Sequence, residues 1–234
     1  MRTLRIVAML LFLVGSCVSQ DKGGVDQTVA IPVVQKIVSG AQLSGSLEYW
    51  GVCDVGKPRP GFPELRPVSG HEGSALDVLQ EMFADDPKMR VIQERDGKIR
   101  MAETDVPKDF LEVKIHHLSF PSLYHSGAIY HSGAMAVYAI LNTPEVIDFM
   151  DHNIGRKVAW EGWGMPGQVV IHGPSVPGEL NDVTVAQALD YVLQTFPGFW
   201  FYQNCHNPDV GRKISVGFIN NLKPVSDASL PKAE

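Results

Sequence analysis

The sequence predicts an α+β protein made of two related units, each with the order helix, one or two strands, helix and hairpin, and with small mixed sheets packed on two helices. Three observations support this fold class. An amphipathic pattern at 75–83 returns at 188–196, an Asp96-Gly97 turn separates two apolar runs, and alternating apolar residues follow the second pattern. Helices repeat every 3.6 residues and strands every two, so these patterns separate the two kinds of element.

The first segment of the chain is typical of an export signal. Two arginines precede an apolar run over 6–14, which is too short for a bilayer span of about 20 apolar residues. The run ends in Val-Gly-Ser-Cys, which resembles a bacterial lipobox. We therefore expect residues 1–16 to be a lipoprotein signal peptide and Cys17 to be the lipidation site. Cleavage a few residues later, giving a soluble periplasmic or secreted protein, is the alternative.

The charge of the chain bears on its partners. The net charge is −6, and it becomes −8 when residues 1–16 are removed, because that segment holds Arg2, Arg5 and no acid. An acidic chain without a Lys/Arg stripe argues against nucleic-acid binding. With no second long apolar run, membrane contact is expected through the lipid anchor only, as in an outer-membrane lipoprotein facing the periplasm.

The first unit is predicted over 30–118, after a flexible tether at 17–29. It begins with a helix near 32–38. The pattern at 75–83 places four apolar side chains on one face of a second helix: Ala75, Leu76, Leu79 and Phe83. Apolar runs at 89–93 and 99–101 flank Asp96-Gly97, whose two residues are both expected to take positive φ in a hairpin turn. The alternating run at 111–116 predicts a half-buried strand.

The second unit is predicted over 135–219, after a linker at 119–134, and a disordered tail is predicted over 220–234. Residues 135–141 are apolar throughout and are interpreted as its first strand. Thr143-Pro144 predicts a helix start, with the threonine hydroxyl as the cap. Thr184 and Gln187 form a predicted capping box ahead of the helix at 188–196, and strands are expected at 199–204 and near 214–218.

The second unit resembles a known domain family. The segments that carry the resemblance are Leu-Asn-Thr-Pro-Glu-Val at 141–146, Gly-Gln-Val-Val-Ile at 167–171, the run from 180 to 190 that enters the second helix, and Arg-Lys-Ile-Ser-Val at 212–216. In this order they resemble the N0 domain of secretins, also called the secretin and TonB N-terminus short domain. The resemblance covers about a third of the chain. It implies a small domain that works by protein–protein contact at the cell envelope.

The cysteines beyond the signal segment are Cys53 and Cys205. In an oxidising compartment they can form a disulfide, and two buried thiols are the alternative. Their spacing excludes a CxxC redox motif and a cysteine zinc site. No cofactor is predicted.

Four histidines are the candidate metal ligands: His116, His117, His125 and His131. A metal site needs three or four donors that converge, whereas the first two histidines should point to opposite faces of a strand. The last two belong to a duplicated hexapeptide that also fits a simple linker. Because no catalytic motif accompanies them, the sequence favours a non-enzymatic function.

Aromatic residues are the candidate partner surface. Trp160 and Trp163 lie close together, and alternation in the strand at 199–204 places Trp200 and Tyr202 on one face and Phe199 with Phe201 on the other. One face must be core. The other face is expected to be either a partner surface, since Trp and Tyr are frequent in binding hot spots, or a face covered by a second helix.

These observations predict an envelope-anchored lipoprotein that acts as a protein-interaction or assembly module. The expected partner is another envelope protein, for which the resemblance suggests a secretin-type ring or a pilus-type system. The alternative is a small-ligand or metal-binding periplasmic protein, or a hydrolase, that uses the segment from His116 to His131.

Overall fold

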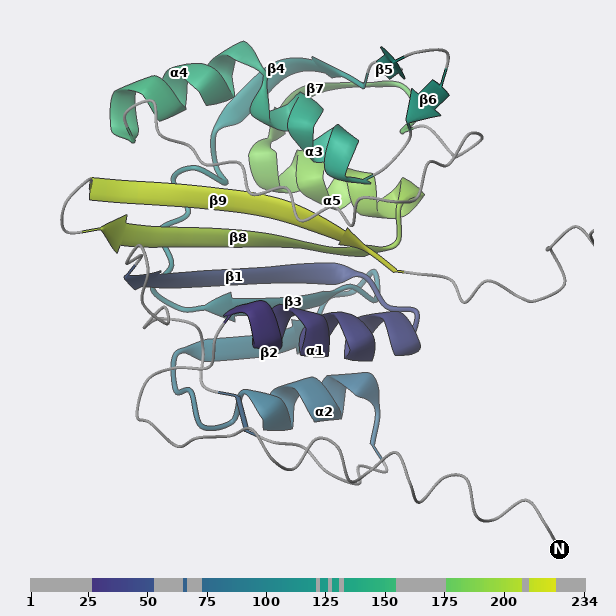
Figure 1. Ribbon diagram of the computed structural model, residues 1–234, viewed down its shortest axis with the longest axis vertical. Coiled ribbons are helices and arrows are strands. Elements are labelled where there is room, and N and C mark those ends of the chain that lie inside the picture. Colours follow the sequence, from purple (N-terminus) through teal and green to yellow (C-terminus); the bar gives the residue numbers. More distant parts are fainter. Residues whose placement is uncertain are drawn as a thin grey trace, which may run out of the picture.

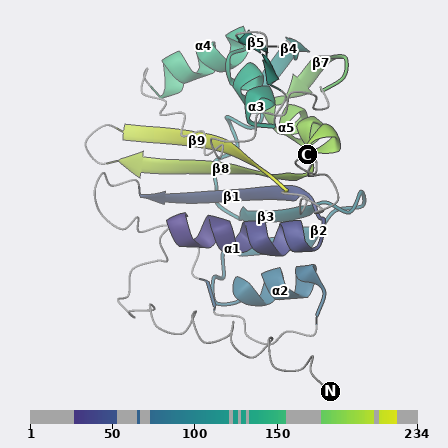
Figure 2. The same cartoon turned by 45° about the vertical axis from the view of Figure 1, so that its right-hand side comes forward.

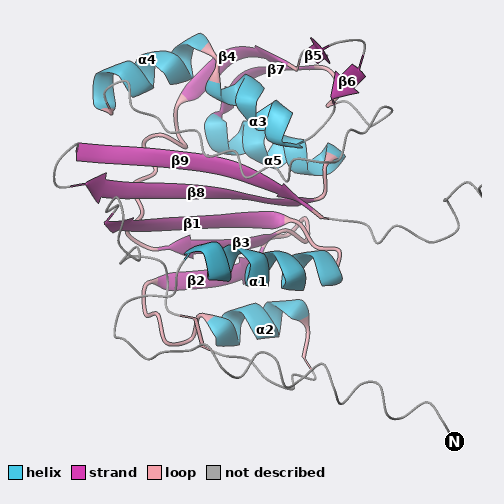
Figure 3. Ribbon diagram, in the orientation of Figure 1, coloured by secondary structure: helices cyan, strands magenta, loops and turns pink. Residues whose placement is uncertain are grey.

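The computed structural model describes residues 27–52, 65–66, 73–120, 123–125, 128–130, 133–154, 176–207 and 211–221. The predicted α+β class is confirmed (Figure 3). The described elements are α1 (Gln27–Gly40), β1 (Gly45–Val52), α2 (Ala75–Met82), β2 (Met89–Gln93), β3 (Ile99–Glu103), β4 (Lys114–Ser119), β5 (Leu123–His125), β6 (Ala128–Tyr130), α3 (Gly133–Leu141), α4 (Pro144–Asn153), β7 (Glu179–Thr184), α5 (Val185–Thr195), β8 (Gly198–Asn207) and β9 (Gly211–Asn220).

One five-stranded sheet dominates the described part of the chain, with the strand order β2-β3-β1-β8-β9 (Figure 1). The β2–β3 and β8–β9 pairs are antiparallel hairpins. Strand β1 lies between them and is parallel to both β3 and β8. The early and late parts of the chain therefore build one sheet. Two smaller ribbons, β4–β7 and β5–β6, complete the described strands.

Two hydrophobic cores lie on opposite faces of this sheet. Helices α1 and α2 pack on β1, β2, β3 and β8 to form the first core. Helices α3, α4 and α5, strand β4 and residues 106–111 pack on β8 and β9 to form the second core. Figures 1 and 2 show α1 and α2 beside the β1–β3–β2 part of the sheet, and α3 to α5 at the β8–β9 part. Strand β8 contributes to both cores because its side chains alternate.

Helices α2 and α5 both begin with a capping box. Ser74 caps α2 in a capping box with Asp77, and Thr184 caps α5 in a capping box with Gln187. The second of these was predicted and is confirmed. At α4, Pro144 is the first residue as expected, but Thr143 donates its hydroxyl to Ile140 O instead of capping the helix.

The β2–β3 hairpin is confirmed, but its turn differs from the prediction. Glu94 N–H donates to Lys98 O, and Gly97 N–H donates to Glu94 O. Only Gly97 has a positive φ, of 87°, so Asp96 stays in the ordinary region. This is a five-residue loop with glycine at the left-handed position, rather than a two-residue turn with two positive φ values.

Several predicted boundaries are wrong. Residues 135–141 form most of helix α3, not a strand. The predicted linker at 119–134 contains β5 and β6, and the strand expected at 111–116 is displaced to Lys114–Ser119. Helix α1 begins inside the predicted tether, and β9 extends to Asn220, inside the predicted tail.

Helix α3 fits against the sheet through a small residue. A Cβ atom at Gly133 would collide with the ring of Phe218 on β9, so glycine permits the close approach of α3.

The internal duplication is not confirmed. Both halves contain a capped helix followed by a hairpin, but the segment at 167–171, which the resemblance implies is a strand of the second unit, lies outside the described residues.

Candidate functional site

A charged cluster surrounds Arg100 on β3, on the face of the sheet that holds the second core. We call Glu48, Glu94, Arg100, Lys108 and Asp190 the Arg100 cluster. The Arg100 guanidinium donates to Glu48 Oε1 at 2.6 Å, Glu94 Oε1 at 2.8 Å and Asp190 Oδ2 at 3.0 Å. Glu48 is 1% exposed, and Lys108 Nζ lies 3.3 Å from its second oxygen. The cluster ties β3 to β1 and to α5.

An indole ring supports the same guanidinium. The Arg100 Cζ atom lies 5.6 Å from the centre of the Trp200 ring, within the range of a cation–π interaction. Trp200 Nε1–H donates to Asp190 Oδ1 at 2.8 Å, so Asp190 accepts from both groups. Burial opposes the charge on Arg100, but hydrogen bonds and attraction from the surrounding carboxylates outweigh it and raise the pKa of Arg100. Such a satisfied cluster fits a structural role better than a catalytic one.

A second polar network anchors the segment that follows β3. Tyr202 donates its hydroxyl to Pro107 O at 2.9 Å, and Asn204 Nδ2 donates to the Tyr202 hydroxyl at 2.7 Å. Arg212 holds both oxygens of Asp109 at 2.6 Å. Burial raises the pKa of Tyr202 to about 12, although its bond from Asn204 acts in the opposite direction. This network fixes the segment over the second core.

A row of buried polar side chains crosses the other face of the sheet: Glu103, Tyr49, Gln203 and Ser215, each at most 5% exposed. The register places Tyr49 beside Gln203 and Gln203 beside Ser215. Glu103 Oε2 accepts the Trp50 N–H at 2.7 Å, just beyond the last β1–β3 pair. Burial raises the pKa of Glu103 to about 7, helped by Asp86 and Asp105 and opposed by the Trp50 hydrogen bond.

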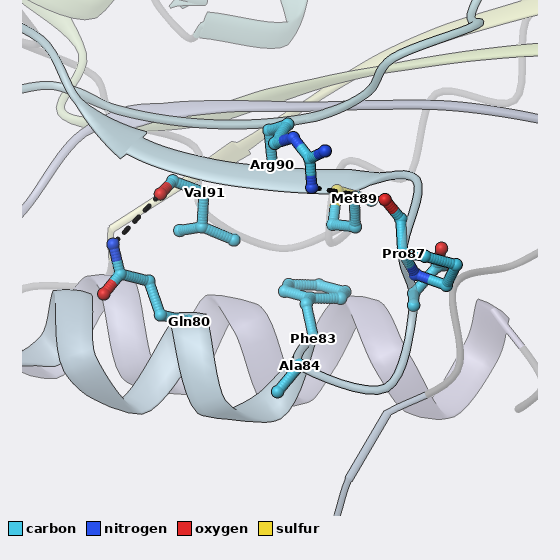
Figure 4. Close-up of a pocket in the computed structure, with 8 residues that line it drawn as sticks. Gln80, Phe83, Ala84, Pro87, Met89, Arg90 and Val91 are labelled. Carbon is cyan, nitrogen blue, oxygen red and sulfur yellow. Dashed lines mark hydrogen bonds between the residues drawn. The ribbon is translucent and has the colours of Figure 1, made fainter.

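A hollow of about 220 Å³ opens between α2 and β2 (Figure 4). Its apolar wall contains Phe83, Met89 and Val91, and its polar rim includes Asp86 and Arg90. In Figure 4 the Phe83 ring lies beneath the strand, between Val91 and Met89. Among the described residues, this is a concave surface of mixed apolar and polar lining next to a strand edge.

Strand β2 is an edge of the sheet, and no described strand pairs with its outer side. Thr104 N–H donates to Lys88 O and Glu94 N–H to Lys98 O, so the even-numbered residues of β2 face β3. In an antiparallel pair the remaining backbone groups, those of Met89, Val91 and Gln93, point outward. Gln80 Nε2 donates to Val91 O at 3.1 Å and so covers one of these carbonyls (Figure 4).

The predicted aromatic partner surface is wrong at the two positions that the structure describes. Trp200 and Tyr202 are both 0% exposed. Helix α5 and the segment after β3 cover them, which is the alternative that the sequence left open. Phe199 and Phe201 lie in the first core. Trp160 and Trp163 lie outside the described residues.

The candidate metal ligands are not brought together in the described part of the chain. His116 Nδ1 lies 3.0 Å from Asp182 Oδ1, and His117 Nδ1 lies 3.1 Å from Asn181 Oδ1. Both histidines are exposed. The expectation that they face opposite sides of the strand stays a prediction. No group of three or more His, Cys, Asp or Glu side chains suited to a metal occurs among the described residues. The His125 side chain and His131 lie outside them.

Cys205 is disulfide-bonded and 1% exposed. Its register partner on β1 is Gly51, and the described part of β1 ends at Val52, immediately before Cys53. The pairing of Cys53 with Cys205 stays a prediction, because Cys53 lies outside the described residues. Cys17 and the signal segment lie outside them as well.

The sequence interpretation missed the Arg100 cluster and the buried row. Both involve polar residues in strands, and alternation alone assigns such residues to a solvent face. The one sequence feature near the cluster is Asp190, an acidic residue directly after the apolar pair Ala188-Leu189 in the predicted helix. The missing information was the pairing of β1 with β3 and β8, which brings opposite charges together.

No family model, curated protein or solved structure matches this chain. No described helix has the length and apolar character needed to cross a membrane.

Proposed function

We propose that this chain is a protein-interaction module that binds an extended segment of a partner protein along the outer edge of β2. One observation carries the proposal: a hollow with both apolar and polar lining residues opens directly beside a strand that has no outer partner among the described residues. Strand addition to a sheet edge is a general recognition mode, in which main-chain hydrogen bonds give affinity and pockets for alternate side chains give specificity.

The geometry of the edge supports this mode. Outward backbone groups of Val91 and Gln93 would pair with the incoming strand, and a side chain opposite Val91 would enter the hollow, because cross-strand neighbours share a face. Gln80 now occupies the Val91 carbonyl. Because the Gln80 side chain is exposed, it can rotate away from Val91. It therefore shields this carbonyl from unwanted strand pairing, yet an incoming strand can displace it.

We place this module at the cell envelope, as a lipoprotein anchored at Cys17. The basis is the signal-like segment at 1–16 and the resemblance of the second unit to the N0 domain of secretins. That family works by protein contact, and we propose an envelope protein, such as a secretin-type ring or a pilus-type system, as the partner. The helix found at 135–141 departs from the strand expected there.

A photo-crosslinking experiment tests the proposed function. A photoreactive residue replaces Gln93 in the full chain, and crosslinked partners are identified by mass spectrometry in intact envelopes. Ala84→Trp fills the hollow and should abolish the crosslink, whereas Ala41→Trp, at another exposed alanine, should leave it unchanged. A crosslink that survives Ala84→Trp, or no crosslink at all, overturns the proposal.

A further inference from the structure

We infer that the segment bound at β2 carries a large apolar side chain next to an acidic one, and that the hollow recognises the first and Arg90 the second. This inference rests on the proposed function and adds the chemistry of the partner. It combines the shape of the hollow, the charge at its rim and the alternation of side chains along a strand.

The apolar requirement follows from the size and lining of the hollow. A cavity of about 150 Å³ holds a benzene molecule, so about 220 Å³ accommodates a leucine or phenylalanine side chain. The wall offers Phe83, Met89 and Val91, all at most 9% exposed. A residue opposite Val91 on an added strand points to this side of the sheet.

The acidic requirement follows from the charges around the rim. Arg90 is exposed, and its Nη1 donates to the Pro87 carbonyl at 3.2 Å. The neighbouring charged side chains form ion pairs with one another: Asp85 pairs with Arg66, and Asp105 pairs with Lys88. Asp86 Oδ1 accepts the Lys88 N–H. Among the described residues, Arg90 is therefore the rim cation without a carboxylate partner.

Strand geometry connects the two requirements. Arg90 precedes Val91, so its side chain leaves the strand on the other face. On an added strand, the residue next to the apolar anchor lies opposite Arg90 and shares that face. A carboxylate there meets the guanidinium, which binds carboxylates through its fork of donors.

Binding of synthetic peptides to the full chain tests this inference. The reference peptide is an extended nonamer of threonine and valine with a central leucine between two glutamates. One matched peptide replaces both glutamates by glutamine, and another replaces leucine by alanine. Affinities are measured by fluorescence anisotropy at low salt. The glutamate peptide should bind about threefold more tightly than the glutamine peptide, as expected for an exposed ion pair, and the alanine peptide should bind most weakly.

Two variants distinguish a direct contact with Arg90 from an effect of the net charge of the protein. Arg90→Gln should remove the preference for glutamate, whereas Arg95→Gln, the same charge change on the same hairpin, should retain it. Equal affinity for the glutamate and glutamine peptides, with binding still lost in Ala84→Trp, overturns the acidic requirement and leaves the proposed function intact. A preference that persists in Arg90→Gln also overturns it. If all three peptides bind and Ala84→Trp changes none of their affinities, both proposals are overturned.

Discussion

Glu103 is the residue whose protonation should control stability near neutral pH. Its pKa is raised by burial to about 7 from an ordinary 4.5. The folded chain therefore binds this proton more tightly than the unfolded chain does, and the advantage is complete only below the unfolded pKa. It is lost as the pH rises through the window from 4.5 to 7.

We predict that Glu103→Gln reduces the loss of stability between pH 5 and pH 8. Between pH 5 and pH 8 the free energy of unfolding of the wild type should therefore fall on the order of 2–3 kcal/mol further than that of the variant. Urea unfolding at both pH values measures it, with Glu112→Gln, a change at an exposed glutamate, as the control. The same pH dependence in Glu103→Gln and wild type would contradict the assignment.

Arg100 and Glu48 form an ion pair whose members depend on each other. Removing Arg100 leaves the buried Glu48 with Lys108 as its remaining described cation. We predict that Arg100→Met costs about 3–5 kcal/mol, as expected for an uncompensated buried charge. The double variant Arg100→Met/Glu48→Met should recover a large part of this loss. Chemical denaturation at pH 7 measures the cycle, and a double variant no more stable than Arg100→Met would argue against the pair.

At the scale of elements, the two capping boxes make a direct comparison possible. Ser74 and Thr184 each accept a hydrogen bond from the backbone N–H three residues later. We predict that Ser74→Ala and Thr184→Ala each cost about 1 kcal/mol, the usual value for an N-cap. Thr143→Ala should not weaken α4 through capping, because its hydroxyl donates to Ile140 O. Unfolding curves of the three variants test this, and a neutral Thr184→Ala would refute the capping role.

The same elements show what the sequence could predict. The helices at α2 and α5 were found because apolar residues recur at helical spacing, and the β2–β3 hairpin because a glycine turn separates two runs. Residues 135–141 were misassigned because an apolar run without polar residues has no period, so strand and buried helix are not distinguished. In the structure the run is α3, buried at Ala136, Val137 and Ile140.

The candidate site was only partly predictable. The sequence interpretation placed a partner surface on aromatic residues and also considered sheet edges, but which strands are edges depends on pairing order. No local pattern encodes that β1 lies between β3 and β8. The position of β2 at the edge, and the hollow beside it, therefore required the three-dimensional arrangement.

At the scale of the molecule, the two halves are predicted to be interdependent. The first core includes Phe199 and Phe201 from β8, and Asp190 of α5 binds Arg100 of β3. We predict that residues 27–120 alone do not fold, because one edge of β1 and part of its core are missing. Poor dispersion in an NMR amide spectrum, with recovery on adding residues 121–234, is the expected result. A dispersed spectrum of the isolated fragment would contradict it.

The central position of β1 also affects the order of folding. Gly45 pairs with Phe199, so the middle of the sheet closes only after β8 has emerged from the ribosome. Contacts this distant in sequence form slowly, and an unpaired strand with apolar neighbours invites misassembly in the meantime. A nascent chain of this protein therefore carries β1 with one unpaired edge until the β8–β9 hairpin forms, and a chaperone would protect it most during that interval.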